Sequence, residues 1–135
     1  MIKAGDTFVE KLFFKQEDVI KFAEVTGDCN PIHLDEEYAA KTFFKRPIVH
    51  GFLSGAVFSK VFGTQFPGEG TIYLYQEMKF LAPVFVNEQY IARFEVMEVN
   101  TEKHLGVIKC ILETESGQVC IDGMARLKNN NQFIS

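Results

Sequence analysis

The chain has 135 residues, the length of one domain, and 47% of them are hydrophobic. This composition supplies enough apolar surface for a packed core and excludes an intrinsically disordered chain. The formal net charge of −4 and the scattered basic residues argue against nucleic-acid binding through overall charge.

The first half of the chain predicts one strand followed by helices. Residues 7–14 suggest a strand, and residues 16–26 suggest a helix with one apolar side that ends at Gly27. Asp35 stands where the N-cap of a further helix would lie, with two acidic residues after it. Residues 51–63 predict a helix that is apolar nearly all the way round, which indicates burial on all sides.

The second half predicts a run of strands. Apolar residues alternate with polar ones in four segments, residues 71–82, 89–99, 105–114 and 118–127. In the first of these segments, one face should carry Ile72, Leu74, Met78 and Phe80. Ser116-Gly117 is a plausible turn between the last two strands.

A meander of strands with one polar face is typical of an antiparallel sheet. The simplest assembly wraps this sheet around the apolar helix, so we predict an α+β fold of the hot-dog type with a central buried helix. Residues 1–135 should form a single domain, and residues 128–135 should be a loosely held tail.

The N-terminal segment and the cysteines bear on the compartment. Residues 1–14 contain neither a long apolar core nor a small-residue cleavage site, so they do not resemble a signal peptide. No stretch has the length needed to cross a membrane. The cysteines, Cys29, Cys110 and Cys120, are odd in number and widely spaced, which fits reduced thiols in a cytoplasmic protein.

Residues 26–35, TGDCNPIHLD, combine turn-forming residues with a histidine. Pro31 disfavours a helical conformation at Asn30, and a loop bent there can bring the Asp28 carboxylate and the His33 imidazole together. Such a pair can hold a water and move protons to and from it, with Asn30 supplying an orienting hydrogen bond. The same residue types also form ordinary turns, so this loop alone leaves a structural role open.

Two other kinds of chemistry in this loop have weaker support. A metal site made of His33, Asp35 and Glu36 would have a spacing that matches no standard ligand set, and the two acids have a simpler role at a helix start. Cys29 could be a nucleophile, but nothing in the sequence marks its thiol as activated. We therefore expect no metal.

Residues 46–51, RPIVHG, lead into the apolar helix. The first amides of a helix have no partner within it and lie at its positive end. Gly51 would let a ligand approach these amides closely, and its own amide could hold a carbonyl oxygen that gains negative charge. The structural alternative is that Gly51 only starts the helix and that His50 is a satisfied polar residue.

The two segments together resemble a known family. The first segment carries the pattern Phe22-x-x-Val25-Thr26-Gly27-Asp28-x-Asn30-Pro31-Ile32-His33, which is followed by Ala39. This pattern resembles the signature of the MaoC-like (R)-specific enoyl-CoA hydratases, also called hydratase 2. Residues 46–51 and 68–88 also match in place and spacing. The resemblance covers nearly the whole chain, and the short length is similar to that of the bacterial single-hot-dog members.

The resemblance implies a lyase that reversibly hydrates trans-2-enoyl-CoA to (R)-3-hydroxyacyl-CoA. It implies no metal or other cofactor, because coenzyme A is part of the substrate, and it implies a homodimer with the CoA site near the subunit interface. The catalytic pair maps onto Asp28 and His33, with Asn30 orienting it and the Gly51 amide as the oxyanion donor. Ser59 matches a serine of the central helix near the acyl pocket.

The acyl pocket should be lined partly by the apolar helix. A phenylalanine that pointed into the pocket would shorten it, and the candidates are Phe52, Phe58 and Phe62. Their bulk favours short-chain substrates. His50 is a further candidate for substrate binding. Lys79 and Arg93 are candidates for contacts with the CoA phosphates, although both also suit solvated strand positions.

Three rival functions stay open at the level of sequence. A hot-dog thioesterase would hydrolyse acyl-CoA with an acidic residue, and a non-catalytic acyl-CoA-binding subunit would bind without turnover. A dehydratase for branched or dicarboxylic hydroxyacyl-CoA would share the mechanism and differ in pocket shape. The spacing of Asp28 and His33 also leaves open which of the two takes the proton of the water.

Overall fold

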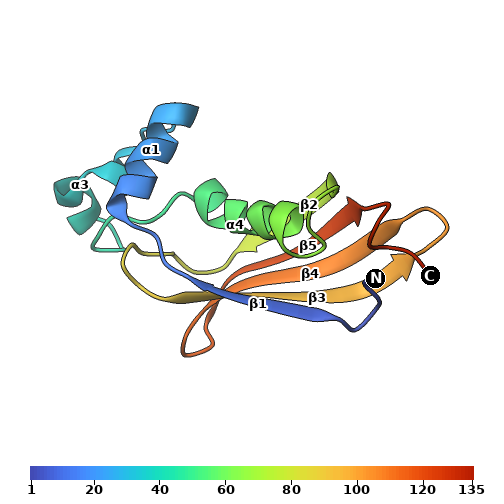
Figure 1. The fold of residues 1–135 in the computed structure, drawn as a ribbon. Coiled ribbons are helices and arrows are strands. Elements are labelled where there is room, and N and C mark those ends of the chain that lie inside the picture. The colour runs from blue at the N-terminus through green and yellow to red at the C-terminus, as the bar shows by residue number, and fades with distance from the viewer.

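A five-stranded antiparallel sheet with one long helix across it forms the body of the computed structural model, which describes residues 1–135. The strands are β1 (Thr7–Leu12), β2 (Ile72–Phe80), β3 (Tyr90–Asn100), β4 (Leu105–Thr114) and β5 (Val119–Lys128), in the sheet order β1-β3-β4-β5-β2. The helices are α1 (Gln16–Thr26), α2 (Pro31–Leu34), α3 (Glu36–Ala40) and α4 (Gly51–Thr64). Figure 1 shows α4 along one face of the sheet, α1 and α3 beyond one end, and both termini at the other end. The predicted α+β hot-dog arrangement is confirmed.

Local signals in the sequence set several element boundaries. Gly27 ends α1 with a φ of 79°, and its amide donates to the Ala23 carbonyl at 2.8 Å. Asp35 caps α3 as predicted, because its Oδ1 accepts from the Tyr38 amide at 3.1 Å. Gly117 takes a φ of 94° in the turn between β4 and β5.

The core lies between α4 and the sheet. Phe58 and Phe62 pack edge-to-face on Phe94 of β3, with ring centroids 5.7 Å and 5.4 Å apart, and all three side chains are at most 2% exposed. Burying a side chain of this size stabilises the fold by about 1.5–3 kcal/mol relative to leaving it exposed. These contacts fix α4 on the sheet.

The helix α4 is covered on one side only within the single chain. Ser54, Phe58 and Phe62 are buried against the sheet, whereas Phe52 on the opposite side is 74% exposed and Ser59 is also exposed. The prediction of a helix buried on all sides therefore needs correction. Five strands cover one face of α4, and they leave its outer apolar face open.

A bulge in β2 inverts part of the predicted alternation. The register with β5 shifts between Tyr73 and Tyr75, so that Leu74 is the extra residue. Tyr73 consequently lies opposite buried Leu127 and packs edge-to-face on Phe62 at 5.7 Å. Ile72, next to Tyr73, therefore does not share the face of Met78 and Phe80, although the simple alternation had predicted that it would.

Two residues of the C-terminal segment pack into the body of the fold, which differs from the expectation of a loose tail. Phe133 is fully buried over Gly106 of β4, where any Cβ would overlap its ring. The Asn129 side chain is also buried and accepts hydrogen bonds from the amides of Asn131 and Gln132 at 2.9 Å and 3.0 Å. A long-range ring–glycine contact of this kind leaves no local pattern in the sequence.

All three cysteines are free thiols, as the sequence analysis expected. Cys29 is exposed, whereas Cys110 and Cys120 are buried, and burial raises the pKa of Cys110 to about 11. None of the helices combines the length and the apolar character that a membrane span requires.

Candidate active site

The loop between α1 and α2 is shaped by short-range capping interactions. The Asp28 amide donates to Thr26 Oγ1 at 3.2 Å, directly after the turn at Gly27. Asn30 is the N-cap of α2, and its Oδ1 accepts from the Ile32 amide at 3.2 Å. Pro31 occupies the first position of that helix, where a missing N–H costs nothing. Asn30 thus orients the turn that carries His33, and it does so as a helix cap.

His33 is buried, and one of its ring nitrogens is committed to the backbone. Its Nδ1 lies 2.8 Å from the Ile48 carbonyl oxygen. Because a carbonyl only accepts, Nδ1 carries the proton in the neutral ring and Nε2 has a free lone pair. Burial lowers the pKa of His33 below 6.5, and the nearby His50 also lowers it, while the Ile48 hydrogen bond and Asp28 act in the opposite direction. The neutral, basic form is therefore favoured.

His50 lies behind His33 and supports the loop. Its Nε2 lies 2.9 Å from the backbone oxygen of Asp28, and its ring lies 3.9 Å from the His33 ring and 4.7 Å from that of Phe22. His50 is only 1% exposed, and its buried Nδ1 has no hydrogen-bond partner. It is thus a supporting side chain for Asp28 and His33, and it does not line the cavity described below.

The fold brings Asp28 and His33 together, as the loop motif suggested. One polar side-chain atom from each of Asp28, His33 and His50 lies within 4.8 Å of the others. A single water can bridge two groups at this separation, because each hydrogen bond spans about 2.8 Å. The metal set considered from the sequence, His33 with Asp35 and Glu36, is not gathered, since Asp35 is the cap of α3.

An apolar cavity of about 510 Å³ opens beside His33, and Asp28 is not among its lining residues. Most of its thirteen lining residues are hydrophobic, including Phe43, Phe44, Phe80 and Ile121. Its polar lining consists of the His33 imidazole, the Ser54 hydroxyl and the backbone at Gly51. An acyl chain with one polar group at its head fits such a lining.

Gly51 begins α4 at the edge of this cavity. The first backbone bond of the helix runs from the Ser54 amide to the His50 oxygen at 3.0 Å, so the Gly51 amide has no partner within the helix. A Cβ on Gly51 would come within 2.9 Å of the Phe80 ring, which explains why glycine fits here. The Ser54 hydroxyl donates to the Gly51 oxygen at 2.9 Å and steadies this first turn.

Other residues that the sequence suggested for substrate binding lie elsewhere in the single chain. Ser59 and Phe52 are on the exposed side of α4, and Phe58 and Phe62 are in the core, so none of them lines the 510 Å³ cavity. Lys79 is exposed, and Arg93 is paired with Glu113.

The structure adds lining residues that the sequence analysis missed. Ser54 carried a usable signal, because it lies three residues after Gly51 and therefore on the same helix face. Phe43 and Phe44 lie in an irregular turn between α3 and α4, where no periodicity points to a site. Phe43 is 92% exposed at the cavity rim.

A five-stranded antiparallel sheet with one long helix across it defines the class of hot-dog proteins, and here an Asp–His pair is gathered in the segment before that helix. Residues 3–116 match the model of the MaoC like domain, and the chain belongs to this family.

Proteins of known function and solved structures agree with this assignment. The chain is 40% identical to an (R)-specific enoyl-CoA hydratase of Aeromonas caviae over 85% of this chain and 86% of that protein. It is 37% identical to a 3-hydroxybutyryl-CoA dehydratase of Methylorubrum extorquens, over 94% and 80% respectively. The solved (R)-hydratase from A. caviae involved in PHA biosynthesis superposes with a TM-score of 0.91 at 37% identity, covering 95% of this chain and 97% of that one.

Proposed function

We propose that this protein is a lyase that reversibly adds water to trans-2-enoyl-CoA and forms (R)-3-hydroxyacyl-CoA. The observation that carries the proposal is that a polar side-chain atom of Asp28 lies within 4.8 Å of one of His33, while His33 and Gly51 line the same apolar cavity. The names of the relatives from A. caviae and M. extorquens, a hydratase and a dehydratase of CoA thioesters, describe the two directions of such a reaction.

The water is held between the Asp28 carboxylate and Nε2 of His33. One member of the pair removes a proton as the water oxygen attacks the β-carbon, and the pair delivers a proton to the α-carbon on the same face. Both parts of the water thus add syn, and atoms and charge balance without any further reactant. His33 acts through Nε2, because its Nδ1–H is held by the Ile48 carbonyl.

Negative charge develops on the thioester oxygen when the β-carbon is attacked. The Gly51 amide, at the positive end of α4, is the donor that stabilises this charge. Losing one such donor typically costs about 3 kcal/mol of barrier. The apolar walls of the cavity hold the acyl chain, and no metal or other cofactor takes part in the reaction as written.

We further propose that the protein forms a homodimer. β2 is an edge strand, and its exposed apolar residues continue onto the open face of α4 at Phe52. Pairing two β2 edges would cover this surface and remove an exposed strand edge.

Free thiols at all three cysteines suit a protein of the cytoplasm, which we propose as its compartment.

The test is a series of enoyl-CoA and saturated acyl-CoA substrates of different chain lengths, given to the purified protein. We expect loss of the conjugated enoyl thioester with no free thiol, and the fastest turnover with short chains. Release of free CoA from saturated acyl-CoA would instead identify a thioesterase. Tight binding without turnover of any substrate would identify a non-catalytic acyl-CoA-binding subunit.

A further inference from the structure

We propose that Arg46 is a positioning residue for His33, acting through the clamp that it forms with Phe85, Glu88 and Tyr90. The proposal rests on the proposed function, since it concerns the histidine of the same site. Arg46 begins the RPIVHG segment, and no chemical role follows for it from the catalytic scheme above.

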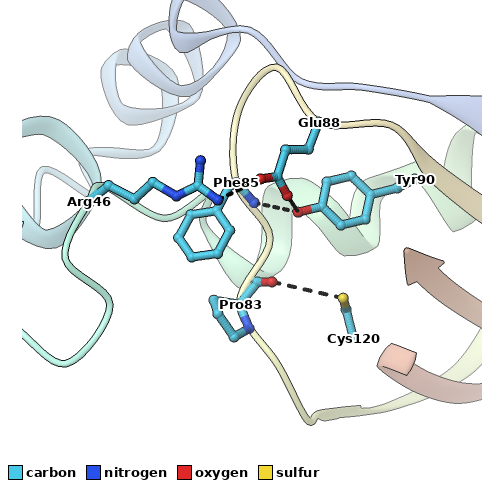
Figure 2. Close-up of polar contacts among 6 residues, drawn as sticks. All are labelled: Arg46, Pro83, Phe85, Glu88, Tyr90 and Cys120. Atoms are coloured by element: carbon cyan, nitrogen blue, oxygen red, sulfur yellow. Dashed lines mark hydrogen bonds and ion pairs between the residues drawn. The ribbon is translucent and has the colours of Figure 1, made fainter. Parts of the chain in front are cut away.

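The clamp joins the segment before α4 to the loop between β2 and β3. Arg46 Nη2 lies 2.5 Å from Glu88 Oε1, and its guanidinium lies 3.7 Å from the centroid of the Phe85 ring (Figure 2). The Tyr90 hydroxyl accepts from the Phe85 amide at 2.8 Å and donates to Glu88 Oε2 at 3.2 Å. Both carboxylate oxygens of Glu88 are therefore held, one by Arg46 and one by Tyr90.

One end of the clamp is buried in the core. Tyr90 is 1% exposed, and burial raises its pKa to about 12, so its hydroxyl remains a donor across the neutral range. The same loop is tied to β5 by a contact of 3.8 Å between Cys120 Sγ and the Pro83 oxygen (Figure 2). Arg46 is thus connected, through Glu88 and Tyr90, to the buried core of the fold.

Two residues after Arg46, the backbone reaches the catalytic histidine. The Ile48 oxygen accepts from His33 Nδ1 at 2.8 Å, and the Ile48 amide donates to the Ile32 oxygen at 3.1 Å. The Val49 amide then donates to the Val84 oxygen at 2.8 Å. Residues 46–49 therefore run as an irregular strap between α2 and the loop at residues 83–88, and the clamp fixes the outer end of that strap.

The expected effect of the Arg46–Glu88 ion pair on folding stability is much smaller than its expected effect on the catalytic rate. The side chains of Arg46 and Glu88 are 51% and 43% exposed, and ion pairs of this exposure contribute little to folding stability. A misplacement of about 1 Å in a catalytic group, however, can cost about 100-fold in rate. Loss of the clamp should therefore affect turnover far more than it affects the fold.

The experiment compares Arg46→Met, Arg46→Lys and Glu88→Gln with wild type, using crotonyl-CoA. Lys60→Met is the control, because Lys60 is exposed to a similar extent as Arg46 and its tertiary ion pair with Glu10 lies outside the site. We expect Arg46→Met and Glu88→Gln to lower kcat about 10- to 100-fold with little change in KM. Arg46→Lys should fall between Arg46→Met and wild type, and Lys60→Met should retain wild-type kcat.

A second readout follows the histidine itself. The Ile48 hydrogen bond raises the pKa of His33, whereas Asp28 and His50 also act on this pKa and stay unchanged in Arg46→Met. Weakening the Ile48 hydrogen bond should therefore move the acid limb of kcat/KM to lower pH in this variant. Nitrogen NMR of the imidazole should show Nδ1 protonated in wild type and a mixture of tautomers in Arg46→Met. A folded Arg46→Met protein with wild-type kcat, acid limb and tautomer would overturn the inference. Failure of the proposed function would look different, because wild type itself would then leave crotonyl-CoA unchanged.

Discussion

His33 Nδ1 lies 2.8 Å from the Ile48 carbonyl oxygen, and this one contact decides which ring nitrogen is free to act on a water. The carbonyl belongs to the strap that leads into α4, whose first amide is the proposed oxyanion donor. Ile48, whose carbonyl holds His33, and Gly51, the proposed oxyanion donor, are therefore only three residues apart along one backbone. Their relative positions are fixed by the fold and do not depend on long side chains.

Removing either member of the catalytic pair should abolish most of the activity. We expect Asp28→Asn and His33→Gln each to lower kcat by about 100- to 10,000-fold, the contribution of a general acid or base. The thermal unfolding temperature of Asp28→Asn should differ little from that of wild type, because Asp28 is exposed. His104→Gln is the matched control, because His104 Nδ1 also bonds a backbone oxygen, that of Phe133, far from the pair in sequence. Wild-type turnover in folded His33→Gln would contradict the assignment.

Activity should survive mild acidification. Burial lowers the pKa of His33, so the neutral ring persists below 6.5 and the acid limb of kcat/KM should lie below that value. The unfolded chain takes up this proton more readily, so the free energy of unfolding should decrease as the pH falls from 6.5 towards the pKa of folded His33. Equilibrium urea unfolding of wild type and His33→Gln across that window checks the sign, and an equal slope in both proteins would rule out His33 as the source.

Gly51 should tolerate no side chain. The Cβ of Gly51→Ala would lie 2.9 Å from the Phe80 ring and would push one wall of the cavity away from the oxyanion donor. We expect a lower kcat in a folded protein. Gly63→Ala, in the same helix with open space around the new methyl group, should keep its kcat and gain up to about 1 kcal/mol in stability. Equal effects of the two substitutions on kcat would show that a side chain at Gly51 does not disturb the catalytic site.

The exposed ring at the cavity rim should contribute to substrate affinity. Phe43 is 92% exposed while lining the cavity, and a solvent-exposed aromatic ring beside an apolar pocket is well placed to contact the entering substrate. Phe43→Ala should raise KM about tenfold, equivalent to about 1.4 kcal/mol, with kcat little changed. Phe13→Ala is the control, because Phe13 is also exposed and lies outside the cavity lining. A KM that stays at the wild-type value would exclude this contact.

Only one of the three thiols should react readily in the native protein. Cys29 is exposed between Asp28 and Asn30, whereas burial raises the pKa of both Cys110 and Cys120 and keeps them as unreactive thiols. Mass spectrometry after brief alkylation should find the label on Cys29 alone. Labelling of Cys110 at the same rate would show that the β4–β5 side of the core opens easily.

Much of the fold follows from local signals in the sequence. The ends of α1, the cap of α3 at Asp35 and the limits of β4 depend on residues within a few positions, and the predictions for them are confirmed. The bulge at Leu74 depends on the register with β5, and the anchoring of Phe133 depends on Gly106, nearly thirty residues away. Neither relationship leaves a periodic pattern.

The site divides in the same way. The TGDCNPIHLD and RPIVHG motifs pointed to Asp28, His33 and Gly51, which the structure places around one site. The roles of these residues remain predictions. The sequence could not show that His50 packs against His33, or that Ser54 and not Ser59 faces the cavity, because both facts depend on how α4 is rotated against the sheet.

Syn hydration by the Asp28–His33 pair can be tested through the stereochemistry of the product. Crotonyl-CoA is incubated with the protein in deuterated water, and the configuration of the product is determined at both new centres. We expect (R)-3-hydroxybutyryl-CoA with deuterium and oxygen added to the same face, formed about 100- to 10,000-fold more slowly by Asp28→Asn. An (S) product, anti addition or release of free CoA in place of hydration would contradict it.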